Sequence, residues 1–411
     1  MLDALLEHPH RAYPSIRVAG TDGKGSTSSM IASILIEAGY RVGTFNTPSI
    51  GSARQMIKIN GIAIAEKEFA YLVSYISDIV EKYDIDSIDK AHLMNIGRKR
   101  TEAALLWFRE QGVDVAVLEG TIGAATCPLG VVSPIISLLT NITADHLELF
   151  ENDINLYAHE KAGIIKPHTP IYVGETPKKA RIKDILIERA KECEANLIFT
   201  DTEEASKIIE RSVNGSYSTL FGDIKMGLGG DYQWNNLNLV LNAVQELREQ
   251  GWNISDENIV SGLAHIYKNT GFCGRWQTML EKPRIILDCG HTPDAWSKIV
   301  PQLKKMKYNR LHIVYQACAD KDIDAIVKLL PDTKNIEYWF PKYENPRLAT
   351  PSYLMEKTER IKKSIRHTAP YIEDTLSHLI SNIEDGDVIF IGGSCKNVHR
   401  VNQYFNEGMH Y

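Results

Sequence analysis

"VAGTDGKGSTSS", residues 18 to 29, holds three glycines, one lysine and a run of hydroxyl side chains. The apolar run "SIRVAG" leads into it and predicts a strand. The residues after it, "STSSMIASILIEAGY", predict a helix because their apolar side chains recur at helical spacing. Glycines let backbone N–H groups approach phosphate oxygens, and the positive end of a following helix points at them. The stretch therefore predicts a strand, a phosphate-binding loop and a helix.

The loop departs from the standard phosphate-loop pattern. That pattern has a glycine where this chain has Val18, and a hydroxyl directly after the lysine, where this chain has Gly25. The chemistry still fits, because Lys24 supplies a positive charge and Ser26 or Thr27 can reach a magnesium ion. The alternative is a glycine-rich turn without a ligand. A lysine between two glycines has little use in such a turn, so we favour phosphate binding.

Length and composition narrow the class of protein. A chain of 411 residues is longer than one core usually covers, which predicts two domains. The net charge of −6 gives no basic footprint for nucleic acid. No apolar run approaches the roughly 20 residues of a membrane helix, and "MLDALLEHPHRAYPS" does not resemble a signal peptide. The six scattered cysteines predict reduced thiols. We therefore expect a cytoplasmic protein with no membrane and no nucleic-acid partner.

Apolar runs and amphipathic stretches alternate along the chain. "VDVAVLEG", "PIISLLTNI" and "TPIYVGE" predict strands with helices between them, which is typical of a mainly parallel α/β sheet. In the first helix Met30, Ile31, Ile34, Leu35 and Ala38 share a face, and Gly39 can cap the end. "SYSTLFGDIKMGLGGDYQ" predicts a hairpin before a helix near Trp234. "RIILDCG", "RLHIVYQA" and "DVIFIGG" begin a second α/β series. We place the domains at 1–279 and 280–411.

Eight motifs occur in the order of one known family. "VAGTDGKGST", "INGIAIAEKEF", "DVAVLEG", "TNITADH", "HEKAGIIKP", "GDYQWNN" with "GRW", "DCGHTPD" and "ACADKD" span nearly the whole chain. Together they resemble the folylpolyglutamate synthase/dihydrofolate synthase branch of the Mur-ligase superfamily. The resemblance implies an N-terminal P-loop ATPase domain with a mainly parallel sheet. It also implies a smaller, Rossmann-like C-terminal α/β domain.

The resemblance also implies an ATP site. Its loop residues would be Gly20, Thr21, Asp22, Gly23, Lys24, Gly25, Ser26 and Thr27. Further ATP contacts would come from Asn236, Arg275, Asp288 and His291. An arginine such as Arg275 could neutralise charge on the transferring phosphoryl group. Taken singly, Asn236 or Arg275 would more often lie on a surface, and His291 could be a solvated loop histidine.

Metal ligands are expected beside the loop. Glu119 ends one predicted strand, and Asp145 and His146 follow another, where ligands bind in open α/β sheets. Magnesium takes oxygen ligands and shares them with substrate phosphates. The resemblance implies a magnesium site with Ser26, Thr47, Glu119, His146 and Lys161, in which Lys161 is carbamylated. The catalytic set would be Lys24, His146, Lys161 and Arg275. The alternatives are a surface glutamate, a core histidine and a solvated lysine.

The match to the family breaks in regions that it uses for its acid and amino-acid substrates. "GTIGAATCPLG" lacks the arginine and aspartate of the family loop, and Ser49 stands where the family has a histidine. Thr292 replaces an asparagine. One further family segment is replaced by Gln55, Met56 and Ile57. Another is replaced by Ile96, Gly97 and Arg98, and this arginine lies within the basic run Arg98, Lys99 and Arg100. We infer that substrate recognition has moved, although ordinary sequence drift is the alternative.

The implied function is an ATP- and magnesium-dependent amide ligase. A carboxylate would attack the γ-phosphate of ATP, and an amino acid, glutamate in the family, would attack the resulting acyl phosphate. Water must be kept away from that intermediate. The first hypothesis is folylpolyglutamate or dihydrofolate synthesis, and the second is ligation to a non-folate acid. The third is a nucleotide-binding regulator without ligase activity. We expect small-molecule partners, namely the acid and the amino acid, and a monomer.

Overall fold

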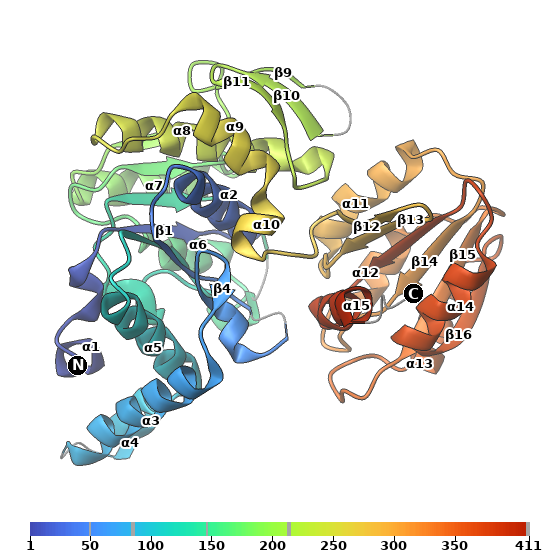
Figure 1. Cartoon of the computed structure of the whole chain (residues 1–411), viewed down its shortest axis with the longest axis horizontal. Coiled ribbons are helices and arrows are strands. Elements are labelled where there is room, and N and C mark those ends of the chain that lie inside the picture. The colour runs from blue at the N-terminus through green and yellow to red at the C-terminus, as the bar shows by residue number, and fades with distance from the viewer. Residues whose placement is uncertain (49–50, 84–86, 145–146, 212–214, 408–411) are drawn as a thin grey trace. The chain divides into compact units, whose positions relative to one another are not determined.

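The computed structural model describes residues 1–48, 51–83, 87–144, 147–211 and 215–407. The chain folds into two compact units (Figure 1). The first comprises Met1–Gly227 and Gln233–Phe272, and the second comprises Leu228–Tyr232 and Cys273–Tyr411. The short segment Leu228–Tyr232 thus belongs to the second unit although the first unit flanks it in sequence. The predicted boundary between residues 279 and 280 stays a prediction.

The first unit is built on an eight-stranded sheet. Its strands follow the order β4-β3-β2-β5-β1-β6-β7-β8 and pair in parallel from β2 to β8, whereas β3 and β4 are antiparallel. The predicted mainly parallel sheet is confirmed. The central strands β1, β5 and β6 are buried along their whole length, which explains why most of their residues are apolar. The strands are β1 (Ser15–Ala19), β2 (Val42–Phe45), β3 (Ile57–Ile59), β4 (Ile62–Ala63), β5 (Val115–Glu119), β6 (Ile136–Leu139), β7 (Ile171–Val173) and β8 (Leu197–Phe199).

Helices cover both faces of this sheet. In Figure 1, α8 and α9 lie on one side of it and α3 and α5 on the other. The α-helices are α1 (Leu2–Leu5), α2 (Lys24–Glu37), α3 (Glu66–Lys82), α4 (Ser87–Leu93), α5 (Ile96–Glu110), α6 (Ile154–Ala162), α7 (Ala180–Glu192), α8 (Trp234–Glu249), α9 (Asp256–Ala264) and α10 (Ile266–Thr270). The short 3₁₀ helices are η1 (Pro9–Ala12), η2 (Ala53–Met56), η3 (Pro128–Val131), η4 (Leu147–Phe150) and η6 (Asp231–Gln233).

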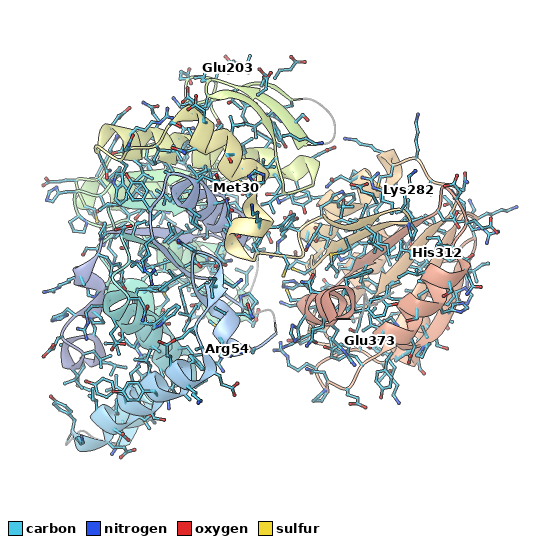
Figure 2. All side chains as sticks on the ribbon, viewed as in Figure 1. Met30, Arg54, Glu203, Lys282, His312 and Glu373 are labelled. Carbon is cyan, nitrogen blue, oxygen red and sulfur yellow. The ribbon has the colours of Figure 1, made fainter. Side chains whose placement is uncertain are left out.

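Helix α2 is buried on all sides rather than on one face. The predicted apolar side chains are interior, and Met30, labelled in Figure 2, is fully buried. The serine face is buried as well, because α2 packs on the sheet and also against α8, α9 and α10. Ser33 Oγ donates to the carbonyl of Gly262 at 2.6 Å. Gly39 ends the helix with a φ of 89°, as its predicted capping role requires.

A small antiparallel sheet follows in the first unit. It consists of β9 (Ile208–Arg211), β10 (Ser216–Thr219) and β11 (Gly222–Lys225), in the order β11-β10-β9. The predicted hairpin is confirmed as β10 and β11. Its buried side chains, Tyr217, Phe221 and Ile224, form the inner face, and β11 packs against α9.

The second unit is also α/β. Its six-stranded sheet has the order β12-β13-β17-β14-β15-β16 and is parallel except for β12. Trp296 lies at its core, with Tyr315 and Phe390 edge-on at 5.3 and 5.9 Å between ring centres. The elements are β12 (Gln277–Glu281), β13 (Arg284–Asp288), α11 (Pro293–Lys305), β14 (Leu311–Tyr315), α12 (Ile323–Leu329), β15 (Ile336–Lys342), α13 (Pro351–Lys357), β16 (Ile365–Tyr371), α14 (Ile372–Asn382), β17 (Val388–Gly392) and α15 (Cys395–Glu407).

The structure bears on two further predictions, that the cysteines are reduced and that the chain has no membrane helix. All six cysteines are free thiols, as the sequence predicts. Within the ranges that the structure describes, every helix is too short or too polar to cross a membrane.

A buried carboxyl group lies on α5 of the first unit. Glu102 is 1% exposed, and its Oε2 has no hydrogen-bond partner among the described residues. Burial, with a smaller contribution from the charge of Asp3, raises the pKa of Glu102 to about 7. Asp3 itself accepts hydrogen bonds from His8 and His10 at 2.5 and 2.8 Å. The Glu102 carboxyl group is therefore more stable in its protonated form inside the fold.

This arrangement predicts a pH-dependent stability. Because the folded pKa of Glu102 is raised, its contribution is fully present below the unfolded pKa and is lost as the pH rises through about 7. We expect Glu102→Gln to be more stable than the wild type by about 2 kcal/mol at alkaline pH, and to match it in mild acid. Urea unfolding across this pH range measures the difference. Glu110→Gln, an exposed carboxylate on the same helix, serves as the control and should show no such trend.

Candidate active site

The predicted phosphate loop joins the end of β1 to the start of α2. Gly23 is the N-cap of α2 with a φ of 80°, so Lys24 is the first helical residue. A side chain at Gly23 would begin 2.3 Å from Oδ1 of Asn236, which comes from α8. Asn236 Nδ2 donates to Gln233 Oε1 at 2.8 Å, and Gln233 Nε2 donates to Ser26 Oγ at 3.3 Å. The fold thus brings the predicted Asn236 to the loop, although they are far apart in sequence.

Polar groups in the loop face inward. The ammonium of Lys24 donates to the carbonyls of Gly20 and Thr21, at 3.1 and 2.7 Å. Thr27 is fully buried, and its hydroxyl has no hydrogen-bond partner in the described part of the chain. A glycine in the left-handed conformation, a lysine and an orphaned hydroxyl at one helix N-terminus suit a bound phosphate group.

The loop is held in place by residues that follow β6. Asn141 Oδ1 accepts from the backbone N–H groups of Thr21 and Asp22, at 3.2 and 3.0 Å. Thr140 Oγ1 donates to the carbonyl of Asp22. The sequence analysis quoted the motif containing Asn141 but did not assign this residue a role. Its position directly after a buried strand, next to the loop-bearing strand, is the signal that could have found it.

Glu119 lies beside the loop at the end of β5. It is 2% exposed, and its Oε2 accepts from Asn46 Nδ2 at 3.0 Å. A side chain at Gly25 would begin 3.6 Å from the same oxygen. Thr47 Oγ1 donates to the carbonyl of Gly120 at 3.3 Å. The carboxylate and hydroxyl oxygens gathered here are the donors that magnesium prefers.

Other predicted ligands are less well defined. Asp145, His146 and Ser49 lie outside the described residues, so the predicted role of His146 stays a prediction. Within the described ranges, no three His, Cys, Asp or Glu side chains form a metal-binding group.

Lys161 comes from α6 and reaches the base of the loop. It is 1% exposed and donates to the carbonyl of Gly20 at 2.8 Å and to that of Ile122. Its Nζ also lies 4.9 Å from the ring centre of Tyr157. A lysine buried this deeply serves a purpose inside the fold, which excludes the solvated alternative.

Glu160 organises the loop that differs from the family. Its Oε1 accepts from the backbone N–H groups of Ala124 and Thr126, both at 2.9 Å, and from Thr126 Oγ1 at 3.0 Å. A side chain at Gly123 would begin only 2.1 Å from this oxygen. The stretch "GTIGAATCPLG" is thus an ordered loop with its own anchor. The sequence analysis missed Glu160 because the adjacent Lys161 carried the family motif.

The second unit brings three predicted residues together by itself. Asp288, at the end of β13, accepts from Tyr232 Oη at 2.7 Å and from the N–H groups of Trp276 and Gly290. Burial raises the pKa of Asp288, against the opposing charge of Arg275. The Arg275 guanidinium donates to the carbonyl of Gly274 and to the sulfur of Cys289. His291 Nδ1 lies 3.1 Å from the carbonyl of Cys289.

Two of the departures from the family have structural roles. Thr292 is the N-cap of α11, and its hydroxyl accepts from the N–H of Ala295 at 3.1 Å. In the basic run, Arg98 contacts His92 of α4 at 3.0 Å, and Lys99 donates to Ser77 of α3 at 3.1 Å. Arg98 and Lys99 therefore help to hold three helices together, whatever else they contact.

The close approach at Gly23 predicts a sensitive position. We expect Gly23→Ala to abolish nucleotide binding, because the new methyl group displaces Asn236 and the left-handed φ becomes unfavourable. The backbone conformation alone should lower the free energy of unfolding by about 1 kcal/mol. Gly39→Ala has a similar φ of 89° with nothing within 4 Å, so it isolates the backbone effect. Calorimetric titration with ATP should show binding lost in the first variant and kept in the second.

The fold and site define a class of protein, and comparison with known proteins agrees. Residues 80–244 match the Mur ligase middle domain, and residues 274–395 match the Mur ligase, glutamate ligase domain. The molecule is thus a two-unit Mur-type ligase.

A curated relative narrows the class to one family. The dihydrofolate synthase/folylpolyglutamate synthase of Bacillus subtilis is 30% identical over 403 residues, which cover 96% of this chain and 90% of that protein. The chain therefore belongs to the dihydrofolate synthase/folylpolyglutamate synthase family, and it is an ATP-dependent ligase. The predicted family and enzyme class are confirmed.

Solved structures share the fold. Mycobacterium tuberculosis folylpolyglutamate synthase complexed with ADP superposes with a TM-score of 0.85 at 24% identity, over 98% of this chain and 93% of that one. A bifunctional folylpolyglutamate synthase/dihydrofolate synthase with Mn, AMPPNP and L-glutamate bound gives 0.76 at 23% identity, over 97% and 91%. At these identities the likeness bears on the fold alone.

Proposed function

We propose that this ligase joins glutamate to a folate through an acyl phosphate formed with ATP. The observation that carries the proposal is the phosphate loop, with Lys24 at its helix N-terminus and the Glu119 carboxylate beside Gly25. Family membership supplies the reaction class, and the relatives' names supply glutamate and folate as substrates. In this proposal the chain works as a monomer in the cytoplasm on small-molecule substrates.

The proposed role of each site residue follows from its position. Lys24 leaves its two loop carbonyls to neutralise the transferring phosphate, and the loop N–H groups hold the phosphates before it. Asn236 helps to hold the loop in place, because it donates to Gln233, which in turn donates to Ser26. Arg275, Asp288 and His291 are the residues of the second unit that we propose to bind nucleotide, as the family resemblance implies. Tyr232 and two backbone N–H groups hold the Asp288 carboxylate in one orientation.

A magnesium ion fits the oxygen donors beside the loop. Ser26, Thr47, Glu119 and the undescribed His146 are the residues we propose to hold it. When bound, the ion supplies positive charge against the phosphate oxygens. Asn46 orients the Glu119 carboxylate by donating to its Oε2 at 3.0 Å.

Carbamylation of Lys161 is part of the proposal. The burial of Lys161 at the base of the loop supports a role close to the phosphates. Converting its amine to a carbamate would replace the contacts to Gly20 and Ile122 with an anion beside the magnesium site. Lys161 would then act as a metal ligand rather than as a cation.

A second candidate is ligation to a non-folate acid. The observation that favours it is the ordered loop from Gly120 to Val131, which Glu160 holds in a sequence unlike that of the family. The family's aromatic segment has also become Ile96, Gly97 and Arg98, at the start of α5. Guanidinium groups suit carboxylates and phosphates better than a flat heterocycle.

The acid substrate can be tested by ADP release. With ATP, magnesium and glutamate, we expect turnover with a reduced folate and weak or absent turnover with dihydropteroate, because the aromatic segment is missing. Mass spectrometry of the products identifies the amide. Robust dihydrofolate formation at micromolar dihydropteroate would contradict the altered acceptor site. Release that requires both an acid and an amino acid excludes a non-catalytic regulator, and release only with other acids favours the second candidate.

A further inference from the structure

Three thiols gather at one edge of the sheet in the second unit. Cys289 follows β13 directly, Cys395 begins α15 just after β17, and Cys318 follows β14. The strands β13, β17 and β14 are neighbours in the sheet, and their parallel pairing puts the three carboxyl ends at the same edge. Cys289 and Cys395 are neighbours in this cluster, because Cys395 Sγ contacts the backbone of Cys289.

The side chains of Cys289 and Cys395 are close enough for each to shift the pKa of the other. Cys395 Sγ also lies 3.9 Å from the carbonyl oxygen of Cys289 and 4.0 Å from His291 Nδ1. The sulfur of Cys289 accepts from the Arg275 guanidinium on its other side. Cys289 is 1% exposed, whereas Cys395 is partly exposed. Solvent therefore reaches the pair through Cys395.

The surroundings favour a thiolate on the outer sulfur. The hydrogen bond from Cys289, then His291 and the charge of Arg275, hold the pKa of Cys395 well below that of an ordinary thiol. The same hydrogen bond and burial raise the pKa of Cys289. Interaction with Cys395 raises the pKa of His291, so the histidine favours its protonated form. A thiolate is the nucleophilic form of cysteine, and an accessible one beside a second thiol is typical of redox-sensitive pairs.

We propose that Cys395 and Cys289 form a dithiol that a peroxide converts to a disulfide. The Cys395 thiolate attacks one peroxide oxygen, the O–O bond breaks, and hydroxide leaves and takes a proton to become water. Cys395 is then a sulfenic acid. The sulfur of Cys289 gives up its proton and attacks the Cys395 sulfur, the S–O bond breaks, and a second water leaves. Two thiols and one hydrogen peroxide thus yield one disulfide and two waters. A dithiol reductant reverses the change by thiol–disulfide exchange.

Disulfide formation would alter the second unit's nucleotide contacts. The two sulfurs must approach to about 2 Å, which draws the start of α15 toward the turn after β13. That turn carries Asp288 and His291, and Arg275 loses its thiol partner. This consequence rests on the proposed function, whereas the modification itself does not. Oxidation would then switch the ligase off when peroxide accumulates.

The modification can be tested without an activity assay. The reduced full chain is treated with hydrogen peroxide, its remaining thiols are alkylated, and its peptides are mapped by mass spectrometry. We expect a disulfide-linked pair of peptides containing Cys289 and Cys395. In Cys289→Ser we expect a sulfenic acid at Cys395 that a cyclic diketone traps, and in Cys395→Ser we expect Cys289 to stay reduced. Cys193→Ser, a buried thiol elsewhere, is the matched control and should leave the linkage unchanged.

Other outcomes would overturn the proposal. Oxidation of Cys318 or Cys273 before Cys395, or over-oxidation of Cys395 without a linked product, would remove the pair from redox chemistry. Cys395→Ala replaces Cys395→Ser if the latter does not fold. Once the linkage is mapped, ADP release measured before and after reduction tests the consequence. A linked protein with unchanged turnover would refute the switch while leaving both the disulfide and the ligase function intact.

Discussion

Lys24→Ala should lose ligase turnover by on the order of a hundred- to a thousandfold at saturating substrates, with its fold intact. The ammonium is the only part of this side chain that contacts the loop in the hydrogen bonds described, through the carbonyls of Gly20 and Thr21. Its removal takes a positive charge away from the transferring phosphate, where each ~1.4 kcal/mol of barrier is a factor of ten in rate. ADP release under saturating acid, glutamate and ATP measures the loss.

Controls separate this loss from a general effect on the protein. Lys67→Ala removes an exposed lysine from α3 and should keep full turnover. A thermal melt of Lys24→Ala should still show a cooperative transition, which establishes that the variant is folded, although the carbonyls of Gly20 and Thr21 lose a donor. A folded Lys24→Ala variant within threefold of the wild-type rate would exclude this residue from the chemistry.

Lys161→Ala should be the second inactive variant, and it should also be less stable. Its removal takes the donor away from the carbonyl of Ile122 and leaves that of Gly20 with Lys24 alone, at a cost of about 1–3 kcal/mol. Lys166→Ala is the matched control. Lys166 also donates to a backbone carbonyl, that of Gly130 in the stretch "GTIGAATCPLG", at 2.7 Å. Urea unfolding and ADP release together should show a comparable loss of stability in both variants and inactivation only in Lys161→Ala.

Chemical rescue distinguishes the two states of Lys161. If the residue works as a carbamate, a short-chain carboxylate should partly restore turnover of Lys161→Ala, and an alkylammonium should not. Carbon NMR of the wild type with isotopically labelled bicarbonate should show a carbamate signal that is absent from the variant. Rescue by the alkylammonium alone would assign the function to the positive charge.

Much of the architecture could be predicted because local patterns agree with the fold. The run before Gly20 is a central strand buried on both faces, so it is mostly apolar, and the glycine and lysine pattern marks its turn into α2. Strand β15 was missed because Pro341 and charged residues interrupt it. Its pairing with β14 ends at Trp339, so the proline breaks no hydrogen bond of that ladder. The sequence alone does not show that a proline is tolerated in this strand, because this depends on the register of the strand pairing.

The candidate site was predictable where a residue carries chemistry itself. Lys24, Glu119 and Lys161 stood out by type and motif, and the structure places all three around the loop. Asn46, Asn141 and Glu160 were not assigned roles because they orient other groups. An asparagine or glutamate after a strand or on a helix has the same sequence pattern whether it anchors a loop or faces solvent. Their roles depend on contacts between segments that are distant in sequence.

Tyr232 and Gln233 are consecutive in sequence but belong to different units. The Tyr232 hydroxyl supports the Asp288 carboxylate, while the Gln233 amide contacts Ser26 in the phosphate loop. No single cut of the chain can therefore release the second unit intact. A fragment beginning at Cys273 would lack Leu228–Tyr232 and would leave the buried Asp288 without its hydroxyl donor. Domain exchange at that point would have to carry the short segment along with the second unit.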